Sequence, residues 1–210
     1  VYKRQLENNE DTGTLQYLAS TAMEAGFSTR VLDMQALDLQ NGRFFDPAGE
    51  LVNRCFKLYP WEWMVDESPD GCLAEMEWLE PIWKLVMSNK AILATLYELF
   101  PDSPYVLPCY LSRPRSGLFC KKPVFSREGH NVSVVDIRDW EEYVRIAETE
   151  GDYNTGAYVY QEYVEPTAYS GRYPVIGSWI IGGEAAGIGI RENRMEVTDN
   201  LSEFVPHIIG

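Results

Sequence analysis

The sequence predicts an α+β fold, in which helices and short strands are mixed without strict alternation. Two segments, residues 12–26 and 88–100, carry apolar residues at helical spacing. After Tyr110 the chain consists of short apolar runs separated by turns, a pattern typical of antiparallel strands. With 45% hydrophobic and 13% aromatic residues, the chain can bury a core and is too apolar for a disordered protein.

The first helix is predicted over residues 12–26, where apolar residues recur every three or four positions and Gly26 ends the pattern. A strand is predicted over residues 29–33, and the Asn-Gly pair at 41–42 indicates a tight turn. Residues 56–83 are rich in aromatic side chains, which dominate the buried area of proteins. We therefore expect this aromatic block to form core.

The second helix is predicted over residues 88–100, with Ser88 or Asn89 as its cap and Pro101 after its last residue. Further elements are expected along the rest of the chain: strands over 119–125 and 132–135, a charged helix over 139–148, a strand over 157–161, and a hairpin of 175–181 with 185–191. These short strands favour antiparallel sheets with flanking helices.

Charge and cysteine content argue against several kinds of partner. The net charge of −14 comes from dispersed carboxylates, which disfavours nucleic acid as a partner. The four cysteines form no Cys-x-x-Cys pair, so reduced thiols are favoured over a zinc site or a disulfide framework. No leader and no apolar run of membrane-spanning length are found, so we expect a cytoplasmic protein without a membrane partner. Because no methionine begins the chain, we expect it to be truncated at its N-terminus.

A small basic loop separates the strands predicted at 119–125 and 132–135. Lys122 lies on the end of the first strand, and Arg127 lies just before Gly129, which opens the next. A glycine there permits positive φ and a close approach of backbone amides to a ligand. Either this loop binds a phosphate, or it is an ordinary turn exposed to solvent.

Two further cations and one strand end leave similar choices open. Lys90 lies in the first turn of its helix, where it opposes the helix dipole, so either an anion lies nearby or the side chain is solvated. Arg191 ends a glycine-containing strand and either meets a ligand or reaches water. Residues 161–164 end a strand before Pro166 and could present backbone groups to a purine ring or be an ordinary strand end.

Seven motifs in order along nearly the whole chain resemble one known family. They are FKLYPWEWM, WLEPIWK, SNKAIL, KKPVFSREGHNVS, YQEY, IGSWIIGGEAAGIGIREN and FVPHII. Together they strongly resemble the carboxy-terminal half of the glutathionylspermidine synthase-like ATP-grasp family, in its stand-alone acid–amine ligase branch. The resemblance implies an ATP-grasp-like fold, with residues 1–88 as an incomplete substrate (pre-ATP-grasp) region and residues 89–210 as the nucleotide-binding region.

The resemblance also implies a reaction. ATP, with Mg²⁺, phosphorylates a carboxylate to an acyl phosphate, and an amine displaces the phosphate to form an amide. The implied substrates are a small-molecule or peptide carboxylate and a polyamine-like amine. Because the phosphoryl group and the carboxylate are both anions, positive charge already in position is needed to bring them together.

Specific residues match the family's functional positions. Lys90 and Lys122 match its ATP-binding lysines, Arg127 and Gly129 lie in its phosphate-covering loop, and Arg191 matches an arginine near the phosphates; Arg127 and Arg191 are the implied catalytic residues. The other implied nucleotide contacts are Gln161, Glu162, Tyr163 and Val164 at adenine, and Glu196, Val197 and Thr198 further along the chain.

An acidic pair, Glu10 and Asp11, matches the residues that hold the cationic amine, and Glu203 is a further candidate. The alternative is structural, because acidic residues near the start of a helix stabilise its N-terminus.

Some positions depart from the family pattern. Val175 replaces a polar nucleotide contact, Asn200 replaces a lysine, and the metal ligands are expected upstream of this chain, so no metal ligand is assigned within it. Two functions therefore stand: a ligase, or a non-catalytic ATP-grasp-like module that binds nucleotide or peptide. A purely structural domain would leave the seven motifs unexplained. The ligase hypothesis predicts that Lys90, Lys122, Arg127 and Arg191 converge on one triphosphate-sized cleft.

Overall fold

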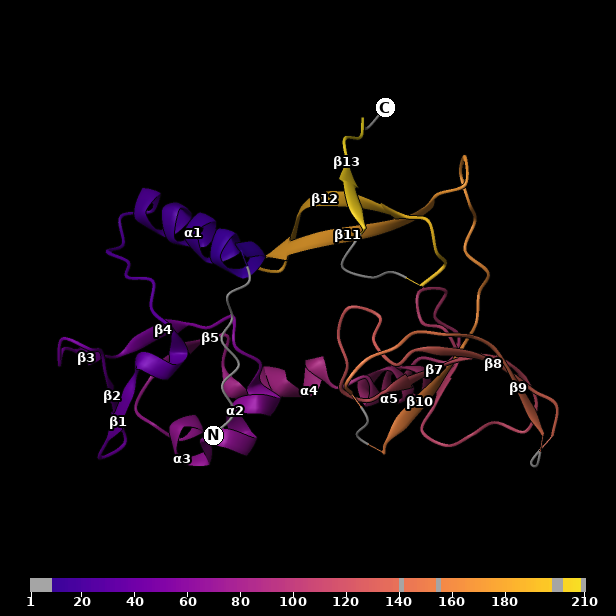
Figure 1. The fold of residues 1–210 in the computed structure, drawn as a ribbon, viewed down its shortest axis with the longest axis horizontal. Coiled ribbons are helices and arrows are strands. Elements are labelled where there is room, and N and C mark those ends of the chain that lie inside the picture. The colour runs from indigo at the N-terminus through magenta and orange to yellow at the C-terminus, as the bar shows by residue number, and fades with distance from the viewer. Residues whose placement is uncertain (1–8, 140–141, 154–155, 198–201, 209–210) are drawn as a thin grey trace. The chain divides into compact units, whose positions relative to one another are not determined.

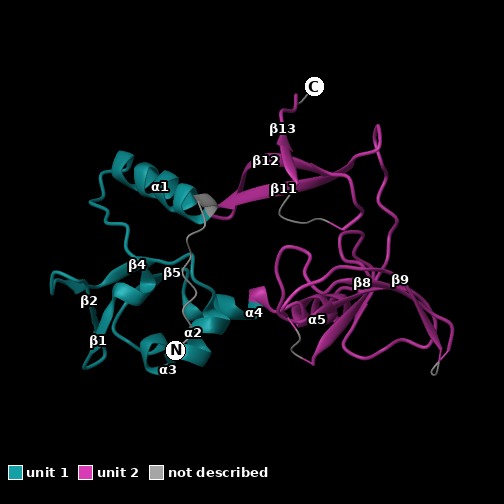
Figure 2. Ribbon diagram, in the orientation of Figure 1, with its two compact units in different colours: residues 1–86 teal, residues 87–210 magenta. Residues whose placement is uncertain are grey.

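The computed structural model describes residues 9–139, 142–153, 156–197 and 202–208. The chain divides into two compact units, residues 1–86 and residues 87–210 (Figure 2). Among the described residues, no helix has both the length and the apolar character needed to cross a membrane.

Unit 1 combines short helices with two small sheets (Figure 1). Its elements are α1 (Asn9–Glu24), η1 (Met34–Ala36), β1 (Asp38–Gln40), β2 (Arg43–Phe45), β3 (Leu51–Val52), β4 (Arg54–Phe56), α2 (Trp61–Glu67), α3 (Pro69–Cys72), β5 (Glu77–Leu79) and η2 (Ile82–Lys84). Strands β1, β2 and β3 form an antiparallel sheet, whereas β4 and β5 pair in parallel. The first predicted helix is confirmed as α1, and Gly26 follows it with φ of 90°.

The core of unit 1 is built around the aromatic block. Its buried members are Phe44, Trp61, Met64, Cys72 and Trp78. The ring of Trp78 meets Phe44 and Trp61 edge to face, at centroid distances of 5.7 and 5.4 Å. Such contacts add to the burial of large apolar area. The prediction that this block forms core is confirmed for Trp61 and Trp78.

Unit 2 contains the longer strands. Helix α4 (Leu85–Ser88) crosses the boundary between the units, and the elements after it are α5 (Ala91–Leu99), β6 (Cys109–Tyr110), β7 (Gly117–Pro123), β8 (Ser133–Ile137), β9 (Tyr143–Glu148), β10 (Tyr158–Glu162), β11 (Tyr173–Ile181), β12 (Glu184–Asn193) and β13 (Glu203–Val205). They form an antiparallel five-stranded sheet, in the order β6-β10-β7-β8-β9, and an antiparallel three-stranded sheet, β11-β12-β13. The second predicted helix and the hairpin are confirmed as α5 and β11–β12.

The two faces of the five-stranded sheet have different cores. Helix α5 packs on one face, where Ala94 joins Cys109 and Val159 in a buried cluster. Phe119, Val135 and Ile137 form the core of the other face, with Tyr160 packed against them. Side chains alternate between faces along a strand. Lys122, directly opposite Val159, therefore points to the α5 face, and Lys121, directly opposite Tyr160, points to the other.

Two predicted elements are wrong. Residues 29–33 form no strand; the Asp33 side chain instead accepts a hydrogen bond from the Gln35 amide at 2.9 Å and caps η1. The charged helix predicted over 139–148 is the strand β9, which pairs with β8. Backbone pairing with β8 outweighs the helix-like composition of this segment. Just before the strand, the Asp139 carboxylate accepts a hydrogen bond from the Glu142 amide at 2.8 Å.

Candidate nucleotide site

Lys122 and Gln161 meet on the α5 face of the five-stranded sheet. The Lys122 ammonium donates to Gln161 Oε1 at 2.8 Å, from neighbouring strands β7 and β10. An ammonium has three donors, so Lys122 can hold Gln161 and an external anion together. Within the described part of the chain, no carboxylate lies at ion-pair distance from Lys122. The structure thus brings together two residues predicted from separate motifs.

Two thiols flank this lysine. Burial raises the pKa of Cys109 and of Cys120, and the positive charge of Lys122 opposes that rise. Both thiols therefore stay protonated near neutral pH and provide no negative charge to neutralise Lys122. All four cysteines are free.

Lys90 is bound to the basic loop. It precedes α5, its ammonium donates to the Ser126 carbonyl oxygen at 2.5 Å and lies 3.0 Å from Ser126 Oγ, and its amide donates to the Val124 carbonyl at 2.8 Å. Ser126 directly precedes Arg127, so the lysine fixes the start of the loop that carries Arg127 and Gly129. The alternative of a purely solvated lysine does not describe this side chain.

The loop between β7 and β8 is held at its far end as well. Glu128, Gly129 and Asn131 have positive φ of 56°, 73° and 55°, which reverses the chain in a short distance. The Thr149 hydroxyl donates to the Gly129 carbonyl, and the Asn131 side chain accepts from the Tyr153 amide at 2.8 Å. Arg127 is exposed between these anchors. The loop therefore carries the exposed Arg127 side chain between two anchored ends.

The segment predicted to hold adenine begins in a central strand. The Glu162 amide donates to the Pro108 carbonyl at 2.8 Å, and the Tyr163 amide donates to the Leu118 carbonyl at 3.0 Å. Of the two alternatives left open for residues 161–164, these two amides fit the ordinary strand end, because β10 lies between β6 and β7. Contact of this segment with adenine stays a prediction. Val164 follows the strand and is exposed.

Tyr163 connects this segment to Glu196. Its hydroxyl donates to Glu196 Oε2 at 2.7 Å. Burial, and then the hydrogen bond and negative charge of Glu196, raise the pKa of Tyr163, so the phenol remains a donor at neutral pH. The Val197 carbonyl accepts from the Asn193 side chain at 3.2 Å. Thr198 lies outside the described residues.

Arg191 lies on the three-stranded sheet, in β12. It faces Val175 and Phe204 across the neighbouring strands, and its guanidinium carbon is 5.9 Å from the Phe204 ring centroid. Among the described residues, no contact joins Arg191 to Lys90, Lys122 or Arg127. The predicted convergence of the four cations therefore stays a prediction. Lys90 is bound to the loop that carries Arg127, and Lys122 lies on β7, the strand before that loop.

The acidic candidates occupy two different units. Asp11 lies in the first turn of α1 and is half-buried; Glu10 belongs to the same turn, but its side chain is outside the described part. Because both residues lie in the first turn of a helix, the alternative that they stabilise its N-terminus stays open. Glu203 pairs with Arg172 at 3.3 Å, so its charge is already balanced.

The search for a metal site concerns clusters of potential ligands among the described residues. Across them, no group of three or more His, Cys, Asp or Glu side chains is placed to bind a metal ion. Asn200, another departure from the family pattern, lies outside the described residues.

Two contacts were not foreseen from the sequence: Ser126 as the partner of Lys90, and the Tyr163–Glu196 hydrogen bond. Both involve residues inside or beside motifs already singled out. Their pairing depends on chain segments 36 and 33 residues apart, and a residue pattern does not specify such a distant partner.

These features define an α+β protein in which Lys122 and Gln161 meet on one sheet and Lys90 is bound to the loop that follows β7. The family model for the glutathionylspermidine synthase preATP-grasp domain matches residues 2–210, and the chain belongs to this family. A Haemophilus influenzae protein named as an acid–amine ligase is 36% identical over 207 residues, covering 94% of this chain and 53% of that protein.

Two other relatives are named as synthetases. Trypanothione synthetase of Crithidia fasciculata is 35% identical over 130 residues, covering 60% of this chain and 19% of that protein. The bifunctional glutathionylspermidine synthetase/amidase of Escherichia coli is 26% identical over 241 residues, covering 100% of this chain and 38% of that protein. The chain spans about half, or less, of the length of these relatives.

Proposed function

We propose that the chain is part of an ATP-dependent carboxylate–amine ligase of the cytoplasm, related in chemistry to glutathionylspermidine synthase. The relatives' names support ligation of an acid to an amine. The observation that carries the proposal is the contact of Lys122 with Gln161, because two residues from separate family motifs meet beside the loop held by Lys90.

In this proposal the nucleotide lies along the α5 face of the five-stranded sheet. Lys122 and Lys90 bind its phosphates, residues 161–164 and 196–198 contact the nucleoside, and the loop with Arg127 and Gly129 covers the phosphates. A cation about 4 Å from a phosphate oxygen contributes roughly 4 kcal/mol at an effective dielectric constant near 20. Loop closure would strengthen these interactions, because it excludes water.

The reaction would proceed in two transfers. A carboxylate oxygen attacks the γ-phosphorus of ATP, the bond to the bridging oxygen breaks, and ADP leaves. An uncharged amine then attacks the acyl phosphate carbonyl, inorganic phosphate leaves, and the amine loses a proton as the amide forms. Arg127 and Arg191 are assigned to the charge that develops on the transferred phosphoryl group. Mg²⁺ is proposed to accompany ATP, and no reaction step is assigned to it here.

The acid is proposed to be a small molecule or peptide, and the amine a polyamine or a similar cation. Acidic side chains would hold such an amine, and Glu10 and Asp11 are better candidates than Glu203, whose carboxylate already pairs with Arg172. A multiply charged amine gains from each unpaired carboxylate that it meets.

The test is release of ADP by the longest protein that contains this chain, supplied with magnesium, ATP, a glutathione-like peptide and spermidine. Lys122→Ala should abolish release, while Lys121→Ala, the adjacent residue on the opposite face, should leave it unchanged. An unaltered rate in Lys122→Ala would remove the phosphate role of this lysine.

A non-catalytic nucleotide-binding or peptide-binding module is the second candidate. It is favoured by the position of Arg191, which contacts Phe204 rather than the other cations among the described residues. Binding of ATP that depends on Lys122, with no release of ADP for any acid and amine, would select this function.

A further inference from the structure

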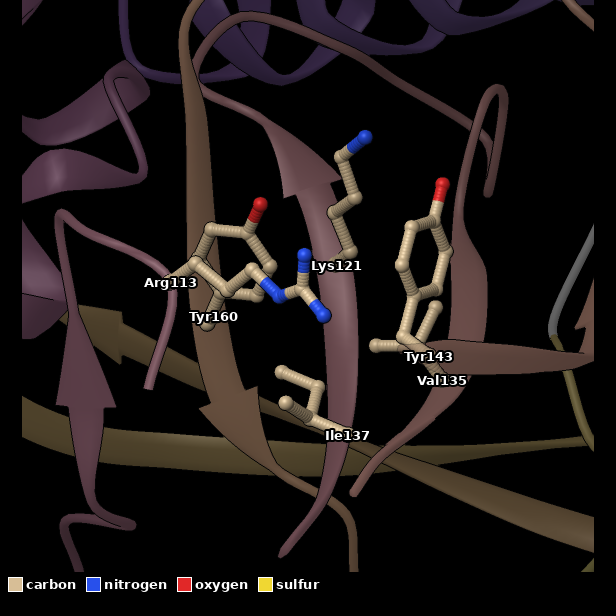
Figure 3. Close-up of a pocket in the computed structure, with 6 residues that line it drawn as sticks. All are labelled: Arg113, Lys121, Val135, Ile137, Tyr143 and Tyr160. Carbon is tan, nitrogen blue, oxygen red and sulfur yellow. The ribbon is translucent and has the colours of Figure 1, made fainter. Parts of the chain in front are cut away.

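A small pocket lies on the face of the five-stranded sheet opposite α5. It has a volume of about 80 Å³ and is lined by Arg113, Lys121, Val135, Ile137, Tyr143 and Tyr160 (Figure 3). Val135 and Ile137, both buried, form its apolar floor. The ends of Lys121, Tyr143 and Tyr160 point toward the same side, with the Arg113 guanidinium between the two tyrosines.

The pocket is locally positive in a strongly acidic chain. Its lining contains an arginine and a lysine but no Asp or Glu, although the chain carries a net charge of −14. Two nearby carboxylates already have partners. Glu142, just before β9, pairs with Arg138 at 3.5 Å, and Glu148, at the end of β9, pairs with Arg145. The positive charge of the pocket is therefore not neutralised by its own lining.

Arg113 is held in place with one donor unused. Its Nη2 donates to the Asp139 carbonyl at 3.0 Å, and its guanidinium carbon lies 4.8 Å from the Tyr143 ring centroid. Its Nε is buried and has no hydrogen-bond partner among the described residues. A buried donor without an acceptor is unfavourable, so this geometry calls for an acceptor in the pocket.

The other lining groups are donors as well. The Lys121 ammonium lies 4.0 Å from the Tyr158 ring centroid, a cation–π contact that restrains it. Burial raises the pKa of Tyr160, although Arg113 opposes the rise, so the Tyr160 hydroxyl remains protonated at neutral pH. Tyr143 adds a second hydroxyl.

We propose that this pocket binds a small oxyanion, the phosphate or carboxylate group of a small molecule, through Arg113 and Lys121 with the two tyrosine hydroxyls. Two fixed cations and neutral donors above an apolar floor are the groups that bind such anions. The site is separate from the proposed nucleotide site, because Lys121 and Lys122 point to opposite faces of β7.

The test follows the Arg113 Nε–H signal by NMR while inorganic phosphate or acetate is added to the chain at constant ionic strength. A saturable shift is expected for at least one of the two anions, and the comparison between them distinguishes phosphate from carboxylate. Lys121→Gln should weaken binding about tenfold, the effect of losing one charge-assisted hydrogen bond. Lys122→Gln should leave the titration unchanged.

Arg138→Gln controls for the loss of one positive charge near the sheet, and it should not alter the affinity. If Lys121→Gln fails to fold, Arg113→Lys is the second variant; it keeps the charge but removes the Nε donor. Its binding is followed by calorimetric titration of the same anion, because the Arg113 signal is lost, and it too should be weaker. A shift that never saturates for either anion, or an equal loss in Lys121→Gln and Lys122→Gln, would overturn the proposal. ATP binding should depend on Lys122 and not on Lys121, so either proposal can fail without the other.

Discussion

The two sheets of unit 2 differ in how deeply their apolar side chains are buried. In the five-stranded sheet, Val135 and Ile137 are 1% exposed and Val159 is fully buried. In the three-stranded sheet, four large apolar residues of β11 are between 63% and 66% exposed: Ile176, Trp179, Ile180 and Ile181. The first sheet has a packed core on both faces, whereas the second owes its order mainly to strand pairing.

This difference bears on the candidate site. Lys122 projects from a strand that is packed on both sides, and its ammonium has a fixed partner in Gln161. Arg191 projects from the three-stranded sheet, and its partner there is the ring of Phe204, itself 78% exposed. A preorganised cation stabilises an anion without the cost of ordering it. We therefore expect Lys122 to act from nucleotide binding onward, and Arg191 to act only after the nucleotide has bound.

The largest expected effect tests the burial difference itself. Ile137→Ala should lower the free energy of unfolding by about 2–5 kcal/mol, because it leaves a cavity in a packed core. Ile180→Ala should cost about 1 kcal/mol or less, the range of strand propensity at an exposed site. Urea denaturation of both variants measures the two costs. Equal costs would mean that the apolar face of β11 is covered in the protein, and the contrast between the sheets would then be lost.

The second largest expected effect distinguishes the role of Lys122 from that of Arg191. Lys122→Ala should weaken binding of a non-hydrolysable ATP analogue about tenfold or more, since a preorganised charge-assisted contact is lost. Arg191→Ala should leave that affinity within about twofold but lower the rate of ADP release. Calorimetric titration and a steady-state assay measure the two quantities. A tenfold loss of affinity in Arg191→Ala would place this arginine in the ground-state nucleotide site and remove the distinction drawn here.

The Tyr163–Glu196 hydrogen bond links the residue after β10 to the segment after β12. Its removal is expected to have a smaller effect. Tyr163→Phe should lower the free energy of unfolding by about 1 kcal/mol, the net value of one hydrogen bond. Because the folded protein holds the pKa of Tyr163 above its ordinary value of 10, the folded state binds more protons above that pH. The stability that depends on this proton is fully present below about pH 10 and falls as the pH rises further.

Denaturation of the wild type and of Tyr163→Phe at about pH 8 and about pH 11 measures both parts of this prediction. The phenylalanine variant should lose less stability between the two pH values, because it lacks the titrating phenol. A fall of the same size in both proteins would show that the phenol at position 163 does not contribute to the alkaline loss. Glu196→Gln is the matched control, since it keeps a hydrogen-bond acceptor while removing the negative charge.

Elements with a strong local signal could be predicted from the sequence. The helix α5 has apolar periodicity and a following proline, and the β11–β12 hairpin has a turn with two glycines of positive φ, at 61° and 86°. The failures are segments in which a tertiary partner decides the structure. Strand β9 has a charged, helix-like composition, but β8 offers it a ladder of backbone hydrogen bonds.

The candidate site likewise contains residues that the sequence indicated and contacts that it did not. Sequence motifs indicated Lys90, Lys122 and Gln161, and alternation along β7 and β10 accounts for the meeting of the last two on one face. The sequence left open whether residues 161–164 offer backbone groups to a ligand, and the carbonyls of Pro108, next to β6, and Leu118, in β7, accept from the amides of Glu162 and Tyr163. Strand order is a long-range property, and local pattern does not reveal which strand becomes central.

The smallest expected effect concerns the acidic candidates for the amine. Glu203→Gln breaks the exposed pair with Arg172 and should change the free energy of unfolding by about 0.5 kcal/mol or less. Because that carboxylate is already paired, the variant should bind spermidine as the wild type does, whereas Asp11→Asn should weaken binding. Calorimetric titration with spermidine at low salt compares the two variants. Weakened binding in Glu203→Gln alone would shift the amine site from the first helix to β13, on the same sheet as Arg191.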